Sequence, residues 1–342
     1  MKKNKFLGFM TASLTSALLL AGCGSSDESA SGGSSETKVI KVANYFAEDH
    51  PQNVALKEKF KTMVEEESNG ELEVQIFPNS TLGAEKEFYD GVRNGTIEMG
   101  IPGLIMQADI PKMGVPEWPF LFKDYEHVQK VLNGSIGEEL TADLESTHGV
   151  KPLAWSANGF RMFSSNKTID SMEAFEGFRL RMPNIPNYIT LGELLGANVT
   201  PLAISEIFTA MEQKVVDGQD NPIATVRASG WYEVQSDILE SKHMFSPNLF
   251  IINSDFYKGL TEEQQQLIEK ASKETADYEF ELMEKSYEDD KAFLEENGMK
   301  FTTPSDEFAA QMEEAAQPLY EDIYSEYDWA EDLADRIRAE AE

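Results

Sequence analysis

The sequence predicts an α/β protein built from two lobes. Extended and helical patterns alternate between residues 38 and 105, as they do when helices cover a parallel sheet. Roughly 300 residues follow the N-terminal segment, which is enough chain for two hydrophobic cores. A helical pattern over residues 261–296 is longer than the usual globular helix, so this helix either bends or spans both lobes as a strut.

The first lobe begins with a β-α-β-α-β pattern. We expect strands at residues 39–43, 71–77 and 97–101, and helices at 53–67 and 84–93. Apolar residues at helical spacing, followed by Asn-Gly pairs, mark the two helices. This pattern implies a parallel sheet with right-handed crossovers. The loops that begin at Asn44, Pro78 and Pro102 then meet at the carboxyl edge of the sheet, where ligands bind.

The second half of the chain continues the mixed pattern. We expect strands at 150–155, 178–182, 199–200 and 249–253, helices at 186–195, 205–214 and 261–296, and helical structure in the acidic stretch 306–342. Thr261, with Gln264 three residues later, predicts a capping box at the start of the long helix. The segment 217–222 (DGQDNP) is rich in turn-forming residues, and we expect a loop there.

The N-terminus carries the pattern of an export signal. Three lysines precede an apolar stretch over residues 6–20, which is shorter than the ~20 apolar residues of a membrane-spanning helix. The sequence LAGC at 20–23 resembles the lipobox of bacterial lipoproteins, in which the segment before the cysteine is removed and the cysteine is lipidated. Cys23 is the only cysteine, and a lone cysteine is ordinarily a buried small hydrophobe or a free thiol, but its position after a signal favours lipidation.

These features predict how the chain is processed and where it is located. We expect a signal peptide at 1–22, and the lipidated Cys23 with a flexible tether at 23–37, because residues 24–37 contain no apolar residue larger than alanine. The folded part is then extracytoplasmic and anchored to the outer face of the cell membrane by lipid.

Charge and missing motifs exclude several classes of function. The formal net charge is −32, and loss of the three lysines in residues 1–22 takes it to −35, so a nucleic-acid partner is not expected. We interpret the acidity as a solvated surface, against which any anionic ligand must be held by local positive charge. The four histidines lack metal-ligand spacing, and there is no phosphate loop, nucleophile elbow or Cys-His pair. We therefore expect no metal, no cofactor and no catalytic residues.

Two arginines at the ends of extended segments are the main candidates for binding. Arg161 and Arg181 lie beside the turn-forming Gly159 and Pro183, respectively. The guanidinium group is a planar fork that matches a carboxylate in two parallel hydrogen bonds. Each arginine would alternatively form a structural ion pair, for which 61 acidic residues offer many partners.

Several ordered motifs resemble one family of receptors. GFRLRMP at 177–183, VDGQDNP at 216–222, NGFR at 158–161 and PNSTLGAEKEFYDGVRNG at 78–95 are similar to conserved segments of the DctP-type solute receptors of tripartite ATP-independent periplasmic (TRAP) transporters. The resemblance covers residues 39 to about 300. It implies a two-lobed fold of the kind found in periplasmic binding proteins, with a ligand cleft between the lobes and a long helix that bridges them.

The resemblance also implies roles for individual residues. Arg181 would form a bidentate clamp on a ligand carboxylate, Arg161 would supply a second charge to the ligand or the clamp, and Asn221 would donate a hydrogen bond to the same carboxylate or a neighbouring hydroxyl. The lobes would comprise residues 38–157 plus about 246–285, and 158–245 plus about 286–342. The partners would be a small organic acid and the membrane subunits of the transporter, and we expect the receptor to be a monomer.

Further residues are candidates for selectivity. They are Asn44, Phe46 and Glu48 in the first strand-end loop, Glu85 at the start of the next helix, and Phe208, Trp231 and Asn248 further along the chain. Ordinary core packing is the alternative for Phe208 and Trp231. Glu48 and Glu85 would bind ligand hydroxyls but repel a second carboxylate, unless both are solvated. This tilts the expected ligand toward a hydroxylated monocarboxylate, such as a hexuronate or aldonate.

Other functions remain open at the level of sequence. The same fold would serve a C4-dicarboxylate or keto-acid receptor, or a ligand-sensing lipoprotein. A secreted enzyme acting on acidic sugars would share the export signal and a cleft, but it would require a catalytic pair in that cleft.

Overall fold

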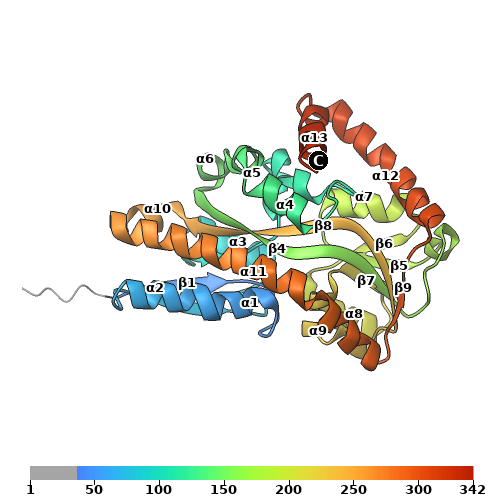
Figure 1. The fold of residues 1–342 in the computed structure, drawn as a ribbon, viewed down its shortest axis with the longest axis horizontal. Helices are drawn as coiled ribbons and strands as arrows, with labels where there is room; N and C mark the ends of the chain where they lie inside the picture. Colours follow the sequence, from blue (N-terminus) through green and yellow to red (C-terminus); the bar gives the residue numbers. More distant parts are fainter. Residues whose placement is uncertain (1–36, 342) are drawn as a thin grey trace, which may run out of the picture. The chain divides into compact units, whose positions relative to one another are not determined.

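Nine strands form one mixed sheet in the computed structural model, which describes residues 37–341 (Figure 1). The strands are β1 (Lys38–Ala43), β2 (Leu72–Phe77), β3 (Met99–Gly100), β4 (Val150–Ser165), β5 (Arg179–Met182), β6 (Asn198–Pro201), β7 (Gly218–Asn221), β8 (Asp237–Asn253) and β9 (Lys300–Thr302). The expected signal peptide, Cys23 and the part of the expected tether before Thr37 lie outside the described residues.

The order of the strands divides the sheet into two parallel groups. The order is β2-β1-β3-β8-β4-β7-β5-β6, with β9 paired to β8. The first group (β2, β1 and β3) and the second group (β7, β5 and β6) are each parallel within themselves. The long antiparallel strands β4 and β8 lie between the groups and pair with each other. This mixed α/β architecture confirms the predicted fold class.

Helices cover the sheet and connect its strands (Figure 1). They are α1 (Pro51–Ala55), α2 (Thr62–Glu67), α3 (Glu85–Arg93), α4 (Tyr125–Leu132), α5 (Ser135–Thr141), α6 (Leu144–His148), α7 (Pro186–Leu194), α8 (Ile207–Glu212), α9 (Ile223–Ala228), α10 (Ser254–Lys258), α11 (Glu262–Glu296), α12 (Asp306–Glu326) and α13 (Ala330–Ala339). A π-helical segment, Leu56–Lys61, joins α1 to α2. The apolar residues that predicted this first helix, Leu56 and Phe60, are buried against Ile40 and Val42 of β1.

The long helix α11 is continuous, as one of the two predicted alternatives requires. It begins after the Thr261 cap, where Thr261 Oγ1 accepts a hydrogen bond from the Gln264 backbone and the Gln264 side chain accepts one from the Thr261 backbone. The helix packs against α1 and α2 beside the first group of strands, and against α9 beside the second. Figure 1 shows it running from α10 to the region of α8 and α9, alongside β4.

The prediction of a loop at 217–222 was wrong. Residues Gly218–Asn221 form β7, which pairs with β4 on one side and β5 on the other. Turn-forming residues occupy this central strand because their polar groups find buried partners there, so tertiary contacts override local propensity. The sequence also located only the end of β8 and the beginning of β4.

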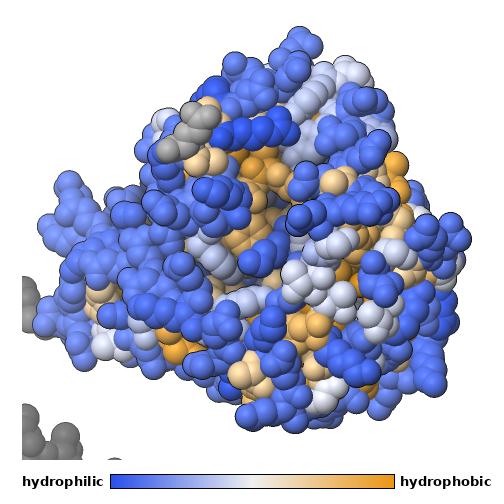
Figure 2. Space-filling model, turned by 45° about the vertical axis from the view of Figure 1, so that its right-hand side comes forward, coloured by the Kyte–Doolittle hydropathy of each residue, from blue (hydrophilic) through white to orange (hydrophobic). Residues whose placement is uncertain are grey.

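The surface is predominantly hydrophilic. In the view of Figure 2, hydrophilic residues surround a hollow whose interior is hydrophobic. Val215 is the one large hydrophobic residue among residues 37–341 that is mostly exposed, with 51 % of its surface accessible to solvent. Within this part of the chain, no helix combines the length and apolar character needed to cross a bilayer.

Candidate ligand-binding site

A cavity of about 500 Å³ lies where the carboxyl ends of the two parallel groups of strands meet. We call it the arginine cavity. It is lined by Tyr45, Ala84, Glu85, Lys86, Glu87, Ile105, Asn158, Arg161, Arg181, Pro183, Asn184, Ile185, Pro201, Leu202, Ala203, Ile204, Glu206 and Asn221. Tyr45, Glu85 and Ile105 follow strands of the first group, as expected for loops at the carboxyl edge of a parallel sheet. The position of the cavity therefore follows from the topology of the sheet.

Arg181 presents an uncompensated positive charge to the cavity. It lies on β5, two residues after Arg179, whose exposed side chain pairs with Asp217. Arg181 is 3 % exposed, and its Nε and Nη2 donate to the Leu202 carbonyl at 3.0 and 2.6 Å. Among residues 37–341, no carboxylate lies within ion-pairing distance of this guanidinium group. Burial lowers the pKa of Arg181 to about 10, so the group is still charged at neutral pH.

Arg161 lines the same cavity but is already paired. Its Nε donates to Asp220 Oδ2 at 2.5 Å, and its Nη2 donates to Asp220 Oδ1 at 3.0 Å. The guanidinium carbon lies 5.0 Å from the centre of the Tyr188 ring. Burial would raise the pKa of Asp220, but Arg161 and His243 hold it well below its usual range. The structural ion pair proposed as an alternative for Arg161 is therefore present, and Asp220 balances most of its charge.

Two asparagines add amide groups to the cavity wall. Asn221, at the end of β7, donates from Nδ2 to Gln219 Oε1 at 2.6 Å. Its Oδ1 can therefore accept a hydrogen bond from another donor. Asn158 accepts a hydrogen bond at Oδ1 from Thr225 Oγ1 at 2.9 Å. Both side chains are 2 % exposed, so their amide orientations are fixed by buried neighbours.

Glu85 and Tyr45 form a polar corner of the cavity. Glu85 Oε1 accepts the Gly103 N–H at 2.8 Å, and Tyr45 Oη accepts a hydrogen bond from Asn248 Nδ2 at 2.7 Å. A Cβ at Gly103 would lie 3.1 Å from Glu85 Oε1 and 3.5 Å from Tyr45 Oη, so both groups approach this glycine closely. Burial raises the pKa of Glu85 to about 7, although the Gly103 N–H and the two cavity arginines oppose this rise.

The structure brings together Arg161, Arg181, Asn221 and Glu85 from the predicted set, and it places the other predicted residues elsewhere. Asn44 is buried and exchanges hydrogen bonds with Asn53, while Phe46 stacks on His50 with ring centres 4.2 Å apart. Both side chains support the shape of the first strand-end loop and do not line the cavity.

Four further residues of the predicted set do not line the arginine cavity either. Glu48 has a 73 % exposed side chain that pairs with Lys57, so it is solvated and outside the cavity. Phe208 and Trp231 pack in a hydrophobic cluster, which is the core-packing alternative. Asn248 is fully buried behind Tyr45 and contacts the cavity only through that side chain.

Sequence reasoning did not identify three important residues. Tyr45 directly follows Asn44 in the predicted loop, so the argument that made Asn44 a candidate applies to Tyr45 as well. Asn158 begins the NGFR motif but was given no role. Asp220 could not be predicted, because the chain has many acidic residues and nothing in the local sequence distinguishes the carboxylate that pairs with Arg161. No group of three or more metal-ligating side chains among residues 37–341 could hold a metal ion.

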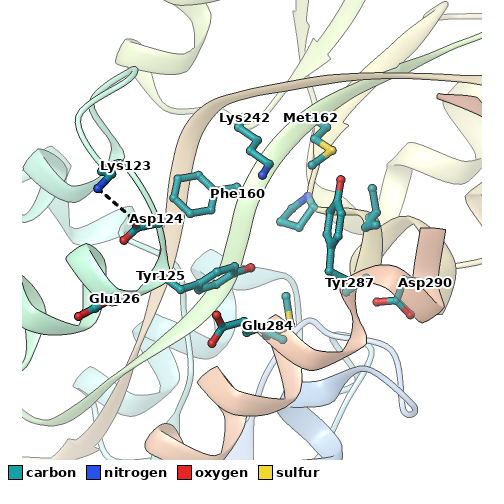
Figure 3. A pocket seen from close by; sticks show the side chains of 14 residues that line it. Lys123, Asp124, Tyr125, Glu126, Phe160, Met162, Lys242, Glu284, Tyr287 and Asp290 are labelled. Atoms are coloured by element: carbon teal, nitrogen blue, oxygen red, sulfur yellow. Dashed lines mark ion pairs between the residues drawn. The ribbon is translucent and has the colours of Figure 1, made fainter. Parts of the chain in front are cut away.

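A second pocket, of about 390 Å³, lies on the opposite face of β4 (Figure 3). Phe160 and Met162 line it, whereas Arg161 between them faces the arginine cavity, as alternation along a strand requires. Figure 3 shows lysines and carboxylates mixed around its aromatic side chains, with Lys123 paired to Asp124 at 3.7 Å. It offers no buried arginine, so the arginine cavity is the better candidate for an organic anion.

Comparison with known proteins agrees with this geometry. Residues 42–327 match the DctP family model, described as bacterial extracellular solute-binding protein, family 7. The Escherichia coli 2,3-diketo-L-gulonate-binding periplasmic protein YiaO is 32% identical over 296 residues, which cover 86% of this chain and 88% of that protein. A TRAP periplasmic solute-binding protein from Haemophilus influenzae, solved with bound L-gulonate, is 39% identical with a TM-score of 0.86, covering 89% of this chain and 100% of that one.

A second solved structure has the same fold and a related bound molecule. The TRAP periplasmic solute-binding protein from Roseobacter denitrificans, with bound L-galactonate, is 30% identical with a TM-score of 0.79 and covers 83% of this chain and 94% of that one. The resemblance seen in the sequence motifs is thus confirmed over nearly the whole described chain. This protein belongs to family 7 of the bacterial extracellular solute-binding proteins, the DctP family of TRAP receptors.

Proposed function

We propose that this receptor captures a sugar acid, such as an aldonate or hexuronate, in the arginine cavity and delivers it to the membrane subunits of a TRAP transporter. The observation that carries the proposal is the buried, uncompensated guanidinium group of Arg181. A charged group in such a site favours an oppositely charged ligand, because the alternative is an unpaired buried charge. The similar proteins solved with L-gulonate and L-galactonate support this class of ligand.

The balance of charge favours one ligand carboxylate over two. Asp220 pairs with Arg161, whereas Arg181 has no ion-pair partner among residues 37–341 and would bind one carboxylate. The carboxylate would accept two parallel hydrogen bonds from the guanidinium fork. Glu85 and Tyr45 would bond ligand hydroxyls, and Glu85 would repel a second carboxylate. A dicarboxylate should therefore bind more weakly than a hydroxylated monocarboxylate of similar size.

Binding would also close the two groups of strands around the ligand. We propose the lobe boundaries given above, 38–157 plus about 246–285 and 158–245 plus about 286–342. The register shift between Ala157 and Gly159 of β4, opposite Pro247 and Ser246 of β8, supports a boundary there. Closure would exclude water from the Arg181 contact and strengthen it.

A thermal-shift screen tests the proposed ligand class. We expect L-gulonate, L-galactonate and D-galacturonate to raise the midpoint of thermal unfolding, because a ligand that binds the folded state stabilises it in proportion to ln(1 + [L]/Kd). Succinate, pyruvate and amino acids serve as comparison sets. Recovery of each ligand unchanged after incubation would agree with a receptor, whereas turnover would identify an enzyme. Stabilisation by succinate alone would contradict the monocarboxylate assignment.

We further propose that the mature receptor is a monomer held at the outer face of the membrane by a lipid on Cys23. The signal-like N-terminus and the polar stretch 24–37 support the anchor. Cys23→Ser should move the protein from the membrane fraction to the soluble fraction, measured by fractionation of cells. Substitution of Ser25 by alanine, two residues later, is the matched control and should leave the protein with the membrane.

A further inference from the structure

The middle of β4 separates the arginine cavity from helix α11 at Ala157–Gly159, which we call the crossing segment. Here β4 changes register against β8, and Gly159 takes φ +114°, a backbone conformation that side chains other than glycine rarely adopt. Asn158 of this segment and Arg161 just beyond it both line the cavity. The backbone position of the crossing segment therefore sets where these two cavity residues lie.

Three side chains approach Gly159 closely on the face of the crossing segment that points away from the arginine cavity. A Cβ at Gly159 would lie 2.7 Å from Tyr125 Oη, 3.1 Å from Met283 Cε and 3.4 Å from Pro222 Cβ. These contacts come from α4, α11 and the residue that caps α9. Figure 3 shows Tyr125 beneath Phe160, reaching from α4 toward β4. Side chains from α4, α11 and the start of α9 therefore leave no room for a Cβ behind Gly159.

Glu279 of α11 makes the one polar contact of this helix with the crossing segment among the described hydrogen bonds. The side chain is fully buried, and its Oε2 accepts the Ala157 N–H at 2.8 Å. Ala157 lies opposite Pro247 of β8, next to the register shift. Among residues 37–341, Glu279 Oε1 has no hydrogen-bond partner. Burial raises the pKa of Glu279 well above its usual value, although the hydrogen bond from the Ala157 N–H opposes this rise.

The groups around Glu279 supply no compensating cation. Burial raises the pKa of Tyr125 on α4 above its usual value. The nearby carboxyl groups of Glu279 and Glu284 raise it further. On the β4 side, Ser156 Oγ donates to Gln52 Oε1 of α1 at 2.9 Å. All of these neighbours are neutral or acidic. A buried carboxyl group without a charged partner is costly compared with an apolar side chain of similar size, so its hydrogen bond needs an explanation.

We propose that Glu279 is a positioning residue for the arginine cavity: its carboxyl group accepts the hydrogen bond from the Ala157 N–H and thereby fixes Asn158 and Arg161 in the cavity wall. The helix that packs beside both groups of strands is thus joined by a hydrogen bond to the wall of the ligand site. This inference rests on the proposed function, since ligand affinity is the property that the contact maintains.

Two substitutions of similar size separate positioning from packing. Glu279→Gln keeps an acceptor for the Ala157 N–H without charge, and it should bind L-gulonate with a Kd within about twofold of wild type. Glu279→Leu fills the same space but leaves the N–H unsatisfied, and it should bind roughly tenfold more weakly or worse. The matched control, Glu274→Leu, makes the same change at an exposed position of α11 and should bind normally. Calorimetric titration of the folded full chain measures Kd, and amide hydrogen exchange of Ala157 reports the contact itself.

The outcomes distinguish this proposal from the proposed function. Absence of L-gulonate binding by wild type would count against the function, while faster Ala157 exchange in Glu279→Leu than in Glu279→Gln would still support the contact. Native affinity in Glu279→Leu, with altered thermal stability only, would show a purely structural role and overturn the proposal. If Glu279→Leu does not fold, Glu279→Asp takes its place, because its shorter side chain withdraws the acceptor and should weaken binding in the same direction.

Discussion

Replacing Arg181 with alanine is expected to weaken sugar-acid binding at least about a hundredfold, the loss that follows when one partner of a buried charge-assisted pair is removed. The side chain is 3 % exposed, and its only hydrogen bonds among residues 37–341 go to the Leu202 carbonyl. Its remaining N–H groups are therefore available to a ligand carboxylate. Isothermal titration calorimetry with L-gulonate measures the effect.

Arg179 provides a matched control for this experiment. It is an arginine on the same strand, two residues earlier, with an exposed side chain paired to Asp217. Arg179→Ala should leave affinity almost unchanged, because an exposed ion pair contributes only ~0–1 kcal/mol even to stability. Arg181→Lys should bind better than Arg181→Ala but below wild type, since an ammonium group lacks the bidentate fork. Equal affinities of Arg181→Ala and wild type would refute the clamp.

Sugar-acid affinity is expected to fall as the pH rises above about 7. Below that pH, Glu85 is protonated, because its pKa is raised to about 7, and the cavity carries the unbalanced charge of Arg181. Above it, the ionised Glu85 adds a negative charge near the bound carboxylate. The bound anion raises the pKa of Glu85 further, so affinity should fall by up to about tenfold per pH unit between the free and bound pKa values.

Titrations of wild type and Glu85→Gln between pH 5.5 and about 9 test this dependence. The substitution should flatten the profile, and Kd should change little with pH. Burial also raises the pKa of Glu117 to about 7, and this residue lies near Arg161. The Kd of Glu85→Gln should therefore still depend weakly on pH. Glu117→Gln in the same background should remove that remainder. A wild-type profile without slope, or the same slope in Glu85→Gln, would contradict the role of Glu85.

The sequence predicted the fold better than it predicted which residues line the ligand-binding site. Hydrophobic periodicity and helix-end signals located β1, β2, α3 and α11, because these elements bury one regular face. Polarity concealed β7, because the carboxylate of Asp220 is satisfied by Arg161, a partner far away in the sequence. Local sequence therefore favoured a turn where three-dimensional contacts impose a central strand.

The site shows the same limitation at the level of single residues. Family spacing located both arginines, but the expectation that each ends a strand was wrong for Arg161, which lies inside β4. Nothing in the sequence showed that Asp220 would pair with Arg161, while Arg181 has no ion-pair partner among residues 37–341. Likewise, Glu48 and Glu85 are similar in sequence context, yet the first is solvated beside Lys57 and the second faces the cavity. Pairing between charges depends on distances that only the folded chain provides.

The position of β8 between the two groups of strands determines the order in which the protein can fold. Strand β3 pairs with Ile251 and Ile252 of β8, and β4 pairs with β8 along most of its length. The first three strands emerge early from the ribosome but cannot join the rest of the sheet until residue 253 has been synthesised. Contacts of such long sequence separation form slowly. The two groups of strands can therefore join into one sheet only after most of the chain has been synthesised.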